Sequence, residues 1–185
     1  MTRSFDEDLT YSKCKEGALD RIYLNYFQNV TGISHIERID EMTRQRAGID
    51  TIVTLNSGET IRTQEKYRTR EFTGDFLIEY CSVFKKGICE KPGWIYTIDA
   101  DYLFAVYAPS QLVKIYPVVQ LKIAFSNNKE KWISKYRIPP AKTIDRYTKE
   151  ILYYTHNIAV PCEILEQEIT KVMRFEYQQK LYNGE

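Results

Sequence analysis

The first 40 residues show two successive patterns of apolar and polar positions. Between residues 8 and 30, apolar side chains recur at spacings of three and four, at Ala18, Leu19, Ile22, Tyr23, Tyr26 and Phe27. This spacing is typical of an amphipathic helix, and Thr31-Gly32 supplies a glycine stop after it. Residues 33–40 (ISHIERID) then alternate between two faces, so we expect a half-buried strand there.

The clearest local pattern predicts a β-hairpin between Ile49 and Arg68. Residues 49–55 (IDTIVTL) are mostly β-branched, residues 56–59 (NSGE) have turn chemistry, and residues 60–68 (TIRTQEKYR) form a second extended run. Asparagine and glycine tolerate positive φ, which is what a tight hairpin turn requires. The run at residues 73–84 predicts the next strand.

The remaining pattern is weaker. Residues 85–93 (KKGICEKPG) indicate a loop, and residues 94–108 indicate one long strand or two short ones. Residues 117–136 predict two helices with a break at Asn127-Asn128. We expect a strand near residues 158–160, and residues 163–182 predict a charged amphipathic helix.

No repeat or composition break divides the chain. We therefore expect one domain over residues 1–185, with a core at about 8–110 and a helical C-terminal part at about 111–185. The expected fold class is α/β, with a central mixed β-sheet flanked by helices and with the N-terminal helix packed on the sheet.

Composition narrows the classes of function. The chain is 43% hydrophobic and 28% charged, with a net charge of +1, so a polyanion partner would have to be bound by local clusters of cations. Only two histidines are present, which argues against histidine-based hydrolases. The four cysteines form no CxxC pair, the N-terminus is polar and acidic, and no apolar run suits a bilayer. We expect a soluble, cytoplasmic protein with reduced thiols and no membrane partner.

The hairpin also carries a candidate active site. Phosphodiester hydrolysis by metal ions needs carboxylates that hold a hard cation, and a nearby lysine that positions or activates water. Asp50 begins the first strand, and Gln64-Glu65-Lys66 lies on the second. Because residues i and i+2 of a strand share a face, Gln64 and Lys66 point to the same side.

These residues resemble the core motif of the PD-(D/E)XK nuclease superfamily. The resemblance covers about residues 14–80 and implies a restriction-endonuclease-like core, a Mg²⁺ cofactor with Mn²⁺ as the alternative, DNA as the partner and a homodimer as one assembly. It also implies catalytic roles for Asp50, Gln64 and Lys66, and for Glu16 on the preceding helix. The sequence departs from the superfamily pattern at Gln64, where an acid is usual. The second metal-binding carboxylate would then be Glu16, Glu65 or Glu79, and Asp75 is a weaker candidate.

Basic and aromatic residues flank the hairpin. Arg44 and Arg46 precede Asp50, and Tyr67, Arg68 and Arg70 follow Lys66, so all five are candidates for nucleic-acid contacts. The expected function is a metal-dependent nuclease acting on DNA. The alternatives are a catalytically degenerate protein of the same fold that binds nucleic acid or a protein partner, and an unrelated structural protein in which Asp50 and Lys66 form an ordinary cross-strand ion pair.

Overall fold

The computed structural model describes residues 20, 22, 24, 32–39, 47–68, 74–107, 110 and 112–183, and for 174–183 the backbone alone. The first sheet is mixed, with strand order β1-β2-β3-β6-β7. Its strands are β1 (Ile33–Arg38), β2 (Thr51–Leu55), β3 (Thr60–Arg68), β6 (Tyr102–Tyr107) and β7 (Leu112–Pro117). Strands β3 and β6 run parallel, and the other neighbours are antiparallel.

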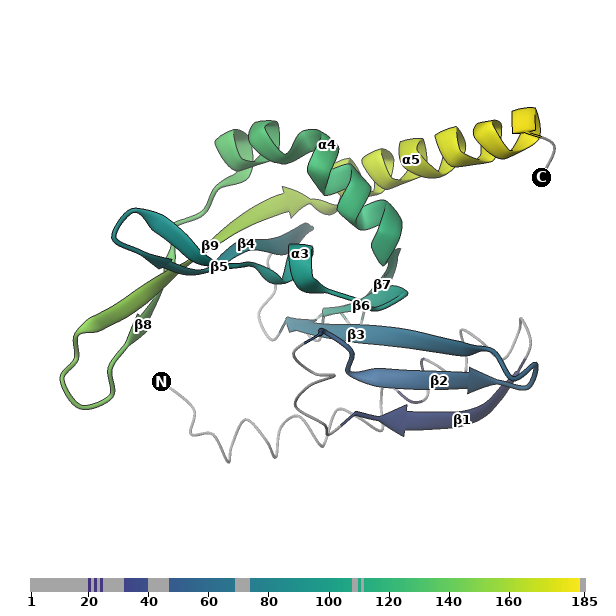
Figure 1. Ribbon diagram of the computed structural model, residues 1–185, viewed down its shortest axis with the longest axis horizontal. Coiled ribbons are helices and arrows are strands. Elements are labelled where there is room, and N and C mark those ends of the chain that lie inside the picture. Colours follow the sequence, from purple (N-terminus) through teal and green to yellow (C-terminus); the bar gives the residue numbers. More distant parts are fainter. Residues whose placement is uncertain are drawn as a thin grey trace.

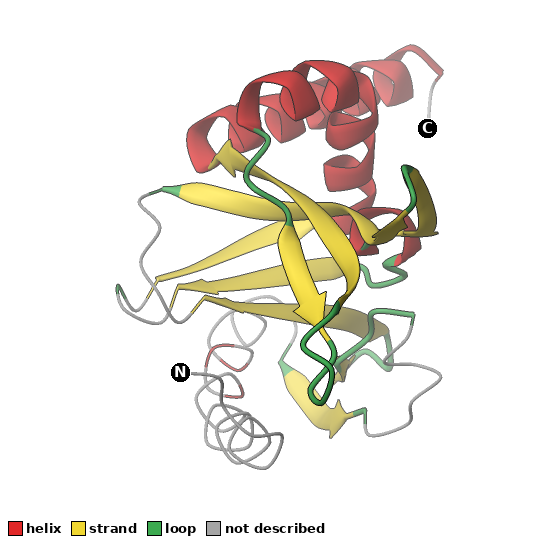
Figure 2. Cartoon of the chain, turned by 90° about the vertical axis from the view of Figure 1, so that its left-hand side faces the viewer, coloured by secondary structure: helices red, strands yellow, loops and turns green. Residues whose placement is uncertain are grey.

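The second sheet is antiparallel, with strand order β5-β4-β9-β8. Its strands are β4 (Asp75–Lys85), β5 (Ile88–Pro92), β8 (Ala141–Ile144) and β9 (Ile151–Pro161). The helices are α3 (Trp94–Thr97), α4 (Val118–Tyr136) and α5 (Cys162–Asn183). Helices α4 and α5 cover the side of the molecule away from β1–β3 (Figure 1, Figure 2). Among the described residues, no helix is long and apolar enough to cross a membrane.

Two hydrophobic cores lie on opposite faces of the mixed sheet. The larger core joins one face of β6 to β4, β9 and the helices, through fully buried side chains such as Leu103, Ile78, Leu121 and Leu165. The smaller core contains Val53, Leu55, Phe104 and Val106, and Ile22 packs against it. Strand β3 therefore has one face toward each core, and this decides where each of its side chains points.

Much of the predicted framework is confirmed. The fold class is α/β with a mixed sheet, and the strand at 33–40, the hairpin, the strand at 73–84 and the C-terminal helix are all present. The strand near 158–160 is also present and is longer, as β9. Of the predicted helix 8–30, only residues 20, 22 and 24 are described, and all three are helical.

The loop predicted at 85–93 is wrong, because β4 and β5 form a hairpin there. The register places Lys85 opposite Ile88, so Lys86-Gly87 is a two-residue turn. Both turn residues have positive φ, 47° for Lys86 and 83° for Gly87. This is the backbone that a right-handed sheet twist favours, but lysine is an unusual residue for it, so the turn is hard to predict from the sequence.

Three other expectations are corrected. Residues 94–108 contain the short helix α3 before the strand β6, rather than strand alone. Helix α4 runs unbroken through Asn127-Asn128, since the side-chain amide of Asn128 donates to the carbonyl of Ala124 at 3.0 Å and to Glu168 at 3.3 Å. Segment 111–185, expected to be helical apart from a strand near 158–160, also carries β7 and β8. Strand β7 pairs with β6 and β8 pairs with β9, and β9 itself pairs with β4, which is distant in sequence.

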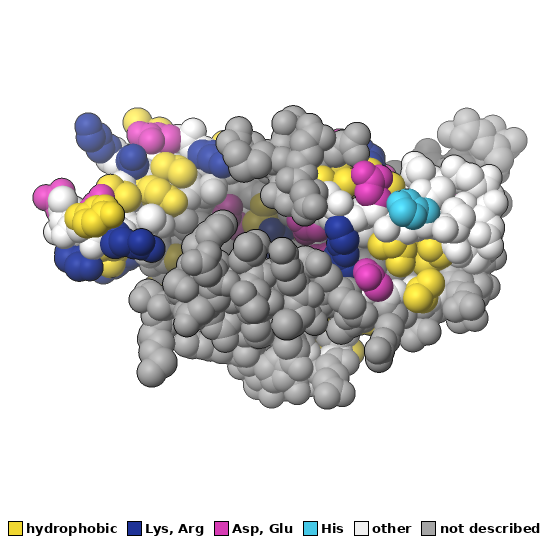
Figure 3. Space-filling view, turned by 90° about the horizontal axis from the view of Figure 1, so that it is seen from below, with side chains coloured by type: hydrophobic (Ala, Val, Ile, Leu, Met, Phe, Trp, Pro, Cys, Tyr) yellow, Lys and Arg dark blue, Asp and Glu magenta, His cyan; other side chains and the backbone are white. Residues whose placement is uncertain are grey.

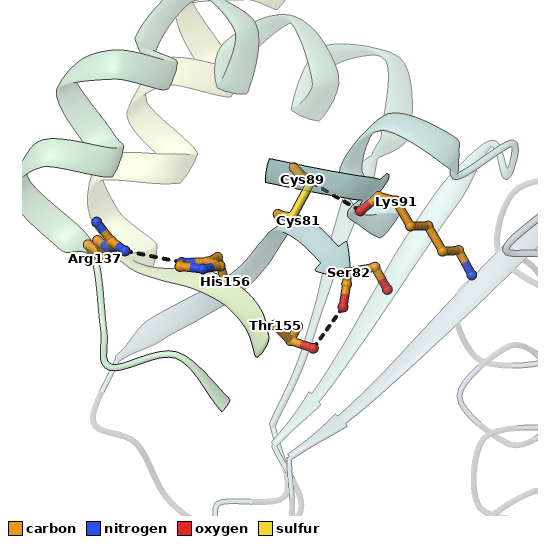
Figure 4. The surroundings of a disulfide bond; sticks show 7 residues. All are labelled: Cys81, Ser82, Cys89, Lys91, Arg137, Thr155 and His156. Atoms are coloured by element: carbon orange, nitrogen blue, oxygen red, sulfur yellow. Dashed lines mark hydrogen bonds between the residues drawn. A yellow bond between two sulfur atoms is a disulfide. The ribbon is translucent and has the colours of Figure 1, made fainter. Parts of the chain in front are cut away.

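Cys81 and Cys89 form a disulfide that links β4 to β5 (Figure 4). The expectation of reduced thiols is therefore wrong for these two cysteines. Cys162 is free and buried, and Cys14 lies outside the described residues. Figure 4 also shows Arg137 donating to Nδ1 of His156 at 3.2 Å beside this disulfide.

Candidate functional site

The hairpin places Asp50 at the edge where β2 begins. The amide of Asp50 donates to the carbonyl of Thr63 at 2.8 Å, and its carbonyl accepts from the amide of Ile39 at 3.0 Å. Its backbone is thereby tied to chain segments on both sides. The carboxylate then has little freedom beyond its own side-chain rotation.

The carboxylate of Asp50 lies against the motif on β3. Its Oδ2 accepts a hydrogen bond from the amide of Glu65 at 2.7 Å. Burial raises the pKa of Asp50, while this hydrogen bond and the charges of Lys66 and Arg38 lower it, and the net direction is upward. Asp50 and Lys66, expected to act together, are therefore brought into electrostatic range of one another.

Lys66 projects from β3 toward the larger core. Burial lowers the pKa of its ammonium group, and the charges of Asp50 and Glu79 act in the opposite direction without reversing it. Its Nζ lies 5.5 Å from the centre of the Trp94 ring, within the range of a cation–π interaction. A half-buried lysine with a lowered pKa is a candidate for proton transfer.

Trp94 is a member of this site that the sequence did not identify. It begins α3, and its ring meets the ring of Phe76 edge to face, with centroids 6.0 Å apart. Gly93 allows the approach, because a Cβ built on it would lie 2.1 Å from the carbonyl oxygen of Glu79. Lys66, Phe76 and Trp94 line a small pocket of about 110 Å³. The only local signal was a glycine directly before a tryptophan.

Gln64 lies on the same face of β3 as Lys66 and is only 6% exposed. Its amide oxygen is buried and has no hydrogen-bond donor. Gly48, with φ of 73°, packs against the other end of the amide, so that a Cβ there would lie 3.0 Å from Nε2 of Gln64. A buried carbonyl oxygen without a donor is costly in a folded protein, and it is a natural ligand for a hard cation.

Glu65 points to the opposite face of β3 from Lys66. Its carboxylate accepts from the hydroxyl of Thr51 at 3.0 Å and pairs with Arg38, which also pairs with Asp20 at 2.7 Å. The register supports this orientation, because Glu65 is opposite Phe104, a member of the smaller core. The candidate metal ligand Glu65 is therefore engaged in an ion pair away from Lys66.

Glu79, on β4, adds a negative charge to the surroundings of Lys66. Its carboxylate is near enough to Lys66 to raise the pKa of the lysine, even though the two strands belong to different sheets. Among the described residues, however, no group of three or more histidine, cysteine, aspartate or glutamate side chains is arranged to hold a metal ion. Glu16 lies outside the described residues.

The residues expected to contact nucleic acid lie in different environments. Arg68 pairs with Asp75, the weaker candidate for a metal ligand. Tyr67 packs against the smaller core. Arg44, Arg46 and Arg70 lie outside the described residues.

Comparisons of this chain with protein-family models, curated proteins and solved structures give no match.

Proposed function

We propose that this protein is a metal-dependent nuclease that hydrolyses phosphodiester bonds in DNA, with its active site around Asp50, Gln64 and Lys66. The observation that carries the proposal is the position of Lys66. It is a half-buried lysine with a lowered pKa, beside the Asp50 carboxylate, and two residues after an amide oxygen that lacks a donor. An ordinary cross-strand ion pair would not explain the oxygen of Gln64.

The side-chain oxygen atoms at this site are of the types that bind Mg²⁺. Asp50 supplies a carboxylate and Gln64 an uncharged carbonyl oxygen, and both are ligands that this cation accepts. Glu79 is a further acid whose charge reaches Lys66. Mg²⁺ usually keeps several waters and binds through one or two carboxylates plus substrate phosphate, so a complete protein shell is not required.

In the proposed reaction, the residues around Asp50 would have distinct roles. Asp50 and Gln64 would hold the cation, which when bound polarises the phosphate and lowers the pKa of its water. Lys66 would orient the attacking water or accept its proton, and the lowered pKa increases the fraction of neutral amine available for this at neutral pH. Trp94 and Phe76 would limit the access of bulk water to the amine.

A second candidate is a catalytically degenerate protein that keeps the same site for binding nucleic acid or a protein partner. Two observations favour it. Gln64 contributes no charge, and Glu65 is held by Arg38 and Thr51 on the opposite face. In this alternative, the Asp50–Lys66 pair would contribute to the fold and the surface around it would contribute binding.

The two candidates are separated by incubating the protein with labelled single-stranded, duplex and branched DNA, in Mg²⁺ or Mn²⁺ and in EDTA. The nuclease proposal predicts cleavage in metal that is absent in EDTA and is lost in both Asp50→Ala and Lys66→Ala. Thermal unfolding of each variant checks that the fold is retained. Cleavage that survives in both folded variants would refute the proposed site.

A further inference from the structure

Strands β8 and β9 extend from the molecule as a two-stranded ribbon (Figure 1). The pairing of β4 with β9 reaches as far as Phe84 and Tyr154, whereas β8 continues to pair with β9 out to Ile144 and Ile151. We call residues 141–154 the hairpin arm. It lies at one end of the elongated molecule, away from the C-terminal helix (Figure 1).

The turn at the tip of the hairpin arm is held in one conformation by Asp145. Oδ1 of Asp145 accepts from the amides of Tyr147 at 2.8 Å and Thr148 at 2.7 Å, and its own amide donates to the carbonyl of Glu150 at 2.8 Å. Lys149 has a φ of 62°, a strained conformation for a residue with a side chain. A turn fixed in this way loses little conformational entropy when it binds a partner.

This turn presents an aromatic ring to solvent. Tyr147 is 87% exposed, the highest fraction among the exposed large hydrophobic side chains of the described residues. Ile144 is 50% exposed, and Ile151 and Leu152 are 43% and 44% exposed. Single exposed apolar residues are common, but a group of four at a protruding tip indicates an interaction surface.

The charge of the same region is positive. The hairpin arm and the neighbouring β4–β5 tip (residues 85–91) are linked through Lys85, whose Nζ lies 5.9 Å from the centre of the Tyr153 ring. Together they carry six cations and three acids, a net charge of +3 against +1 for the whole chain. The cations are Lys85, Lys86, Lys91, Lys142, Arg146 and Lys149, and the acids are Glu90, Asp145 and Glu150. Figure 3 shows lysine and arginine side chains beside hydrophobic ones at this end of the molecule.

The combination of cations with an exposed ring fits a particular occupant. Proteins bind single-stranded nucleic acid by contacting phosphates with cations and by stacking bases on aromatic rings, whereas duplex bases are already stacked on one another. An anionic membrane would attract the same cations, but Asp145, Thr148 and Glu150 belong to the same turn as Tyr147 and would be costly to bury among acyl chains.

We propose that the hairpin arm binds single-stranded DNA, with Tyr147 stacked on an unpaired base and Arg146 and Lys149 contacting the flanking phosphates. The choice of DNA rests on the proposed nuclease function, but binding by the arm does not require cleavage. Under the proposed function, the arm makes single-stranded DNA, or a duplex with a single-stranded extension, the preferred substrate class.

The test measures binding of the full chain to a fluorescein-labelled oligothymidylate strand by fluorescence anisotropy in EDTA, where metal-dependent cleavage cannot occur. Tyr147→Ala should weaken binding about five-fold or more, because stacking of one base is lost. Tyr147→Phe keeps the ring and should bind like the parent. Arg146→Ala should reduce the dependence of log Kd on log salt by about 0.7, the value for one phosphate contact on a single strand.

A matched control for charge is Lys171→Ala on α5, whose side chain is 68% exposed and lies away from the hairpin arm. It should leave binding unchanged. Equal affinity of the parent and Tyr147→Ala would overturn the proposal, as would tighter binding of a matched duplex. Binding to phosphatidylglycerol vesicles that depends on Tyr147, without binding of the strand, would show that the arm contacts lipid instead.

The failure of this proposal can be told apart from the failure of the nuclease proposal. If the protein binds the strand through Tyr147 but cleaves no DNA, the binding role of the hairpin arm is supported and the nuclease proposal is refuted. If the protein cleaves DNA in a metal-dependent way but binds the strand equally well without the Tyr147 ring, the nuclease proposal is supported and the role of the hairpin arm is refuted. Circular dichroism melts of Tyr147→Ala check that its turn and fold are retained.

Discussion

Oδ2 of Asp50 accepts a hydrogen bond from the backbone amide of Glu65 at 2.7 Å. Glu65 lies between Gln64 and Lys66, so this bond holds the Asp50 carboxylate beside both of them. The bond also keeps a carboxylate in a place where burial disfavours its charge. The chain keeps an acid in an unfavourable position next to a lysine whose charge is also disfavoured. Such arrangements are typical of functional sites, although ion pairs with a structural role produce them as well.

The raised pKa of Asp50 predicts a pH dependence of stability. Between the unfolded value of 3.8 and the higher folded value, the native state binds more protons than the unfolded state. The contribution of Asp50 to the free energy of unfolding is therefore fully present below pH 3.8 and is lost as the pH rises through the folded pKa. Lys66→Met removes a charge that lowers the pKa of Asp50, so this window should extend to higher pH.

Urea unfolding across a pH series measures this effect. The difference between Lys66→Met and the double variant Asp50→Asn/Lys66→Met isolates the titration of Asp50. If the two variants show the same pH dependence between acid and neutral pH, folding does not raise the pKa of Asp50.

Gln64→Glu should create a stronger metal site. The added carboxylate would lie beside Asp50 on the face of Lys66, so its repulsion should lower thermal stability in EDTA. Mg²⁺ should then restore stability, because a ligand that binds only the native state stabilises it by an amount that grows with the logarithm of its concentration above Kd. The measurement is the melting temperature with and without Mg²⁺, and Gln167→Glu on the exposed face of α5 is the control. A Mg²⁺ response no larger than that of the control would argue against a cation at this position.

Gly93→Ala should destabilise the protein, because the new Cβ would lie 2.1 Å from the carbonyl oxygen of Glu79. Relief of this clash requires the backbone to move, at a cost of about 1–3 kcal/mol or more. The shift should also move Trp94 away from Lys66, which a change in tryptophan fluorescence would report. Gly58→Ala is the comparison, since a Cβ there meets no atom within 4 Å and its positive φ of 86° alone adds roughly 1 kcal/mol. Equal stability of Gly93→Ala and the parent would contradict the close approach.

Removal of the disulfide should lower the free energy of unfolding by about 2–3 kcal/mol, the chain-entropy value for a short closed loop. Cys81 and Cys89 are eight residues apart, so the loop is short. Cys89→Ala is preferred to a change at Cys81, which is only 2% exposed and would leave a cavity. Reduction of the parent with dithiothreitol should reproduce the loss, whereas an unchanged melting temperature would show that the bond adds no stability.

The sequence predicted the hairpin and the Asp50–Lys66 pair because both depend on local signals. A β-branched run, an Asn-Ser-Gly turn and the period of two along a strand fix which side chains share a face. The same period places Glu65 on the face opposite Lys66, and the ion pair of Glu65 with Arg38 agrees with this.

The rest of the site depends on contacts between segments far apart in the chain. Trp94 reaches Lys66 through the close packing of Gly93 on β4, and no local pattern encodes that approach. The hairpin β4–β5 was missed because Lys86 takes a backbone conformation more typical of asparagine or glycine. The unbroken helix α4 was missed because the amide of Asn128, read as a break, bonds within the helix and to α5 instead.

The most direct test of the nuclease proposal is the single-turnover rate of DNA cleavage by the parent and by Lys66→Met in saturating Mg²⁺. Met keeps the length and apolar stem of the side chain, so the variant removes the amine with little loss of packing. Lys171→Met, on an exposed lysine, is the matched control. We expect the rate of Lys66→Met to fall at least about 100-fold, the usual contribution of a positioned acid or base, while Lys171→Met cleaves like the parent. A folded Lys66→Met variant that cleaves DNA at the parental rate would contradict the proposal.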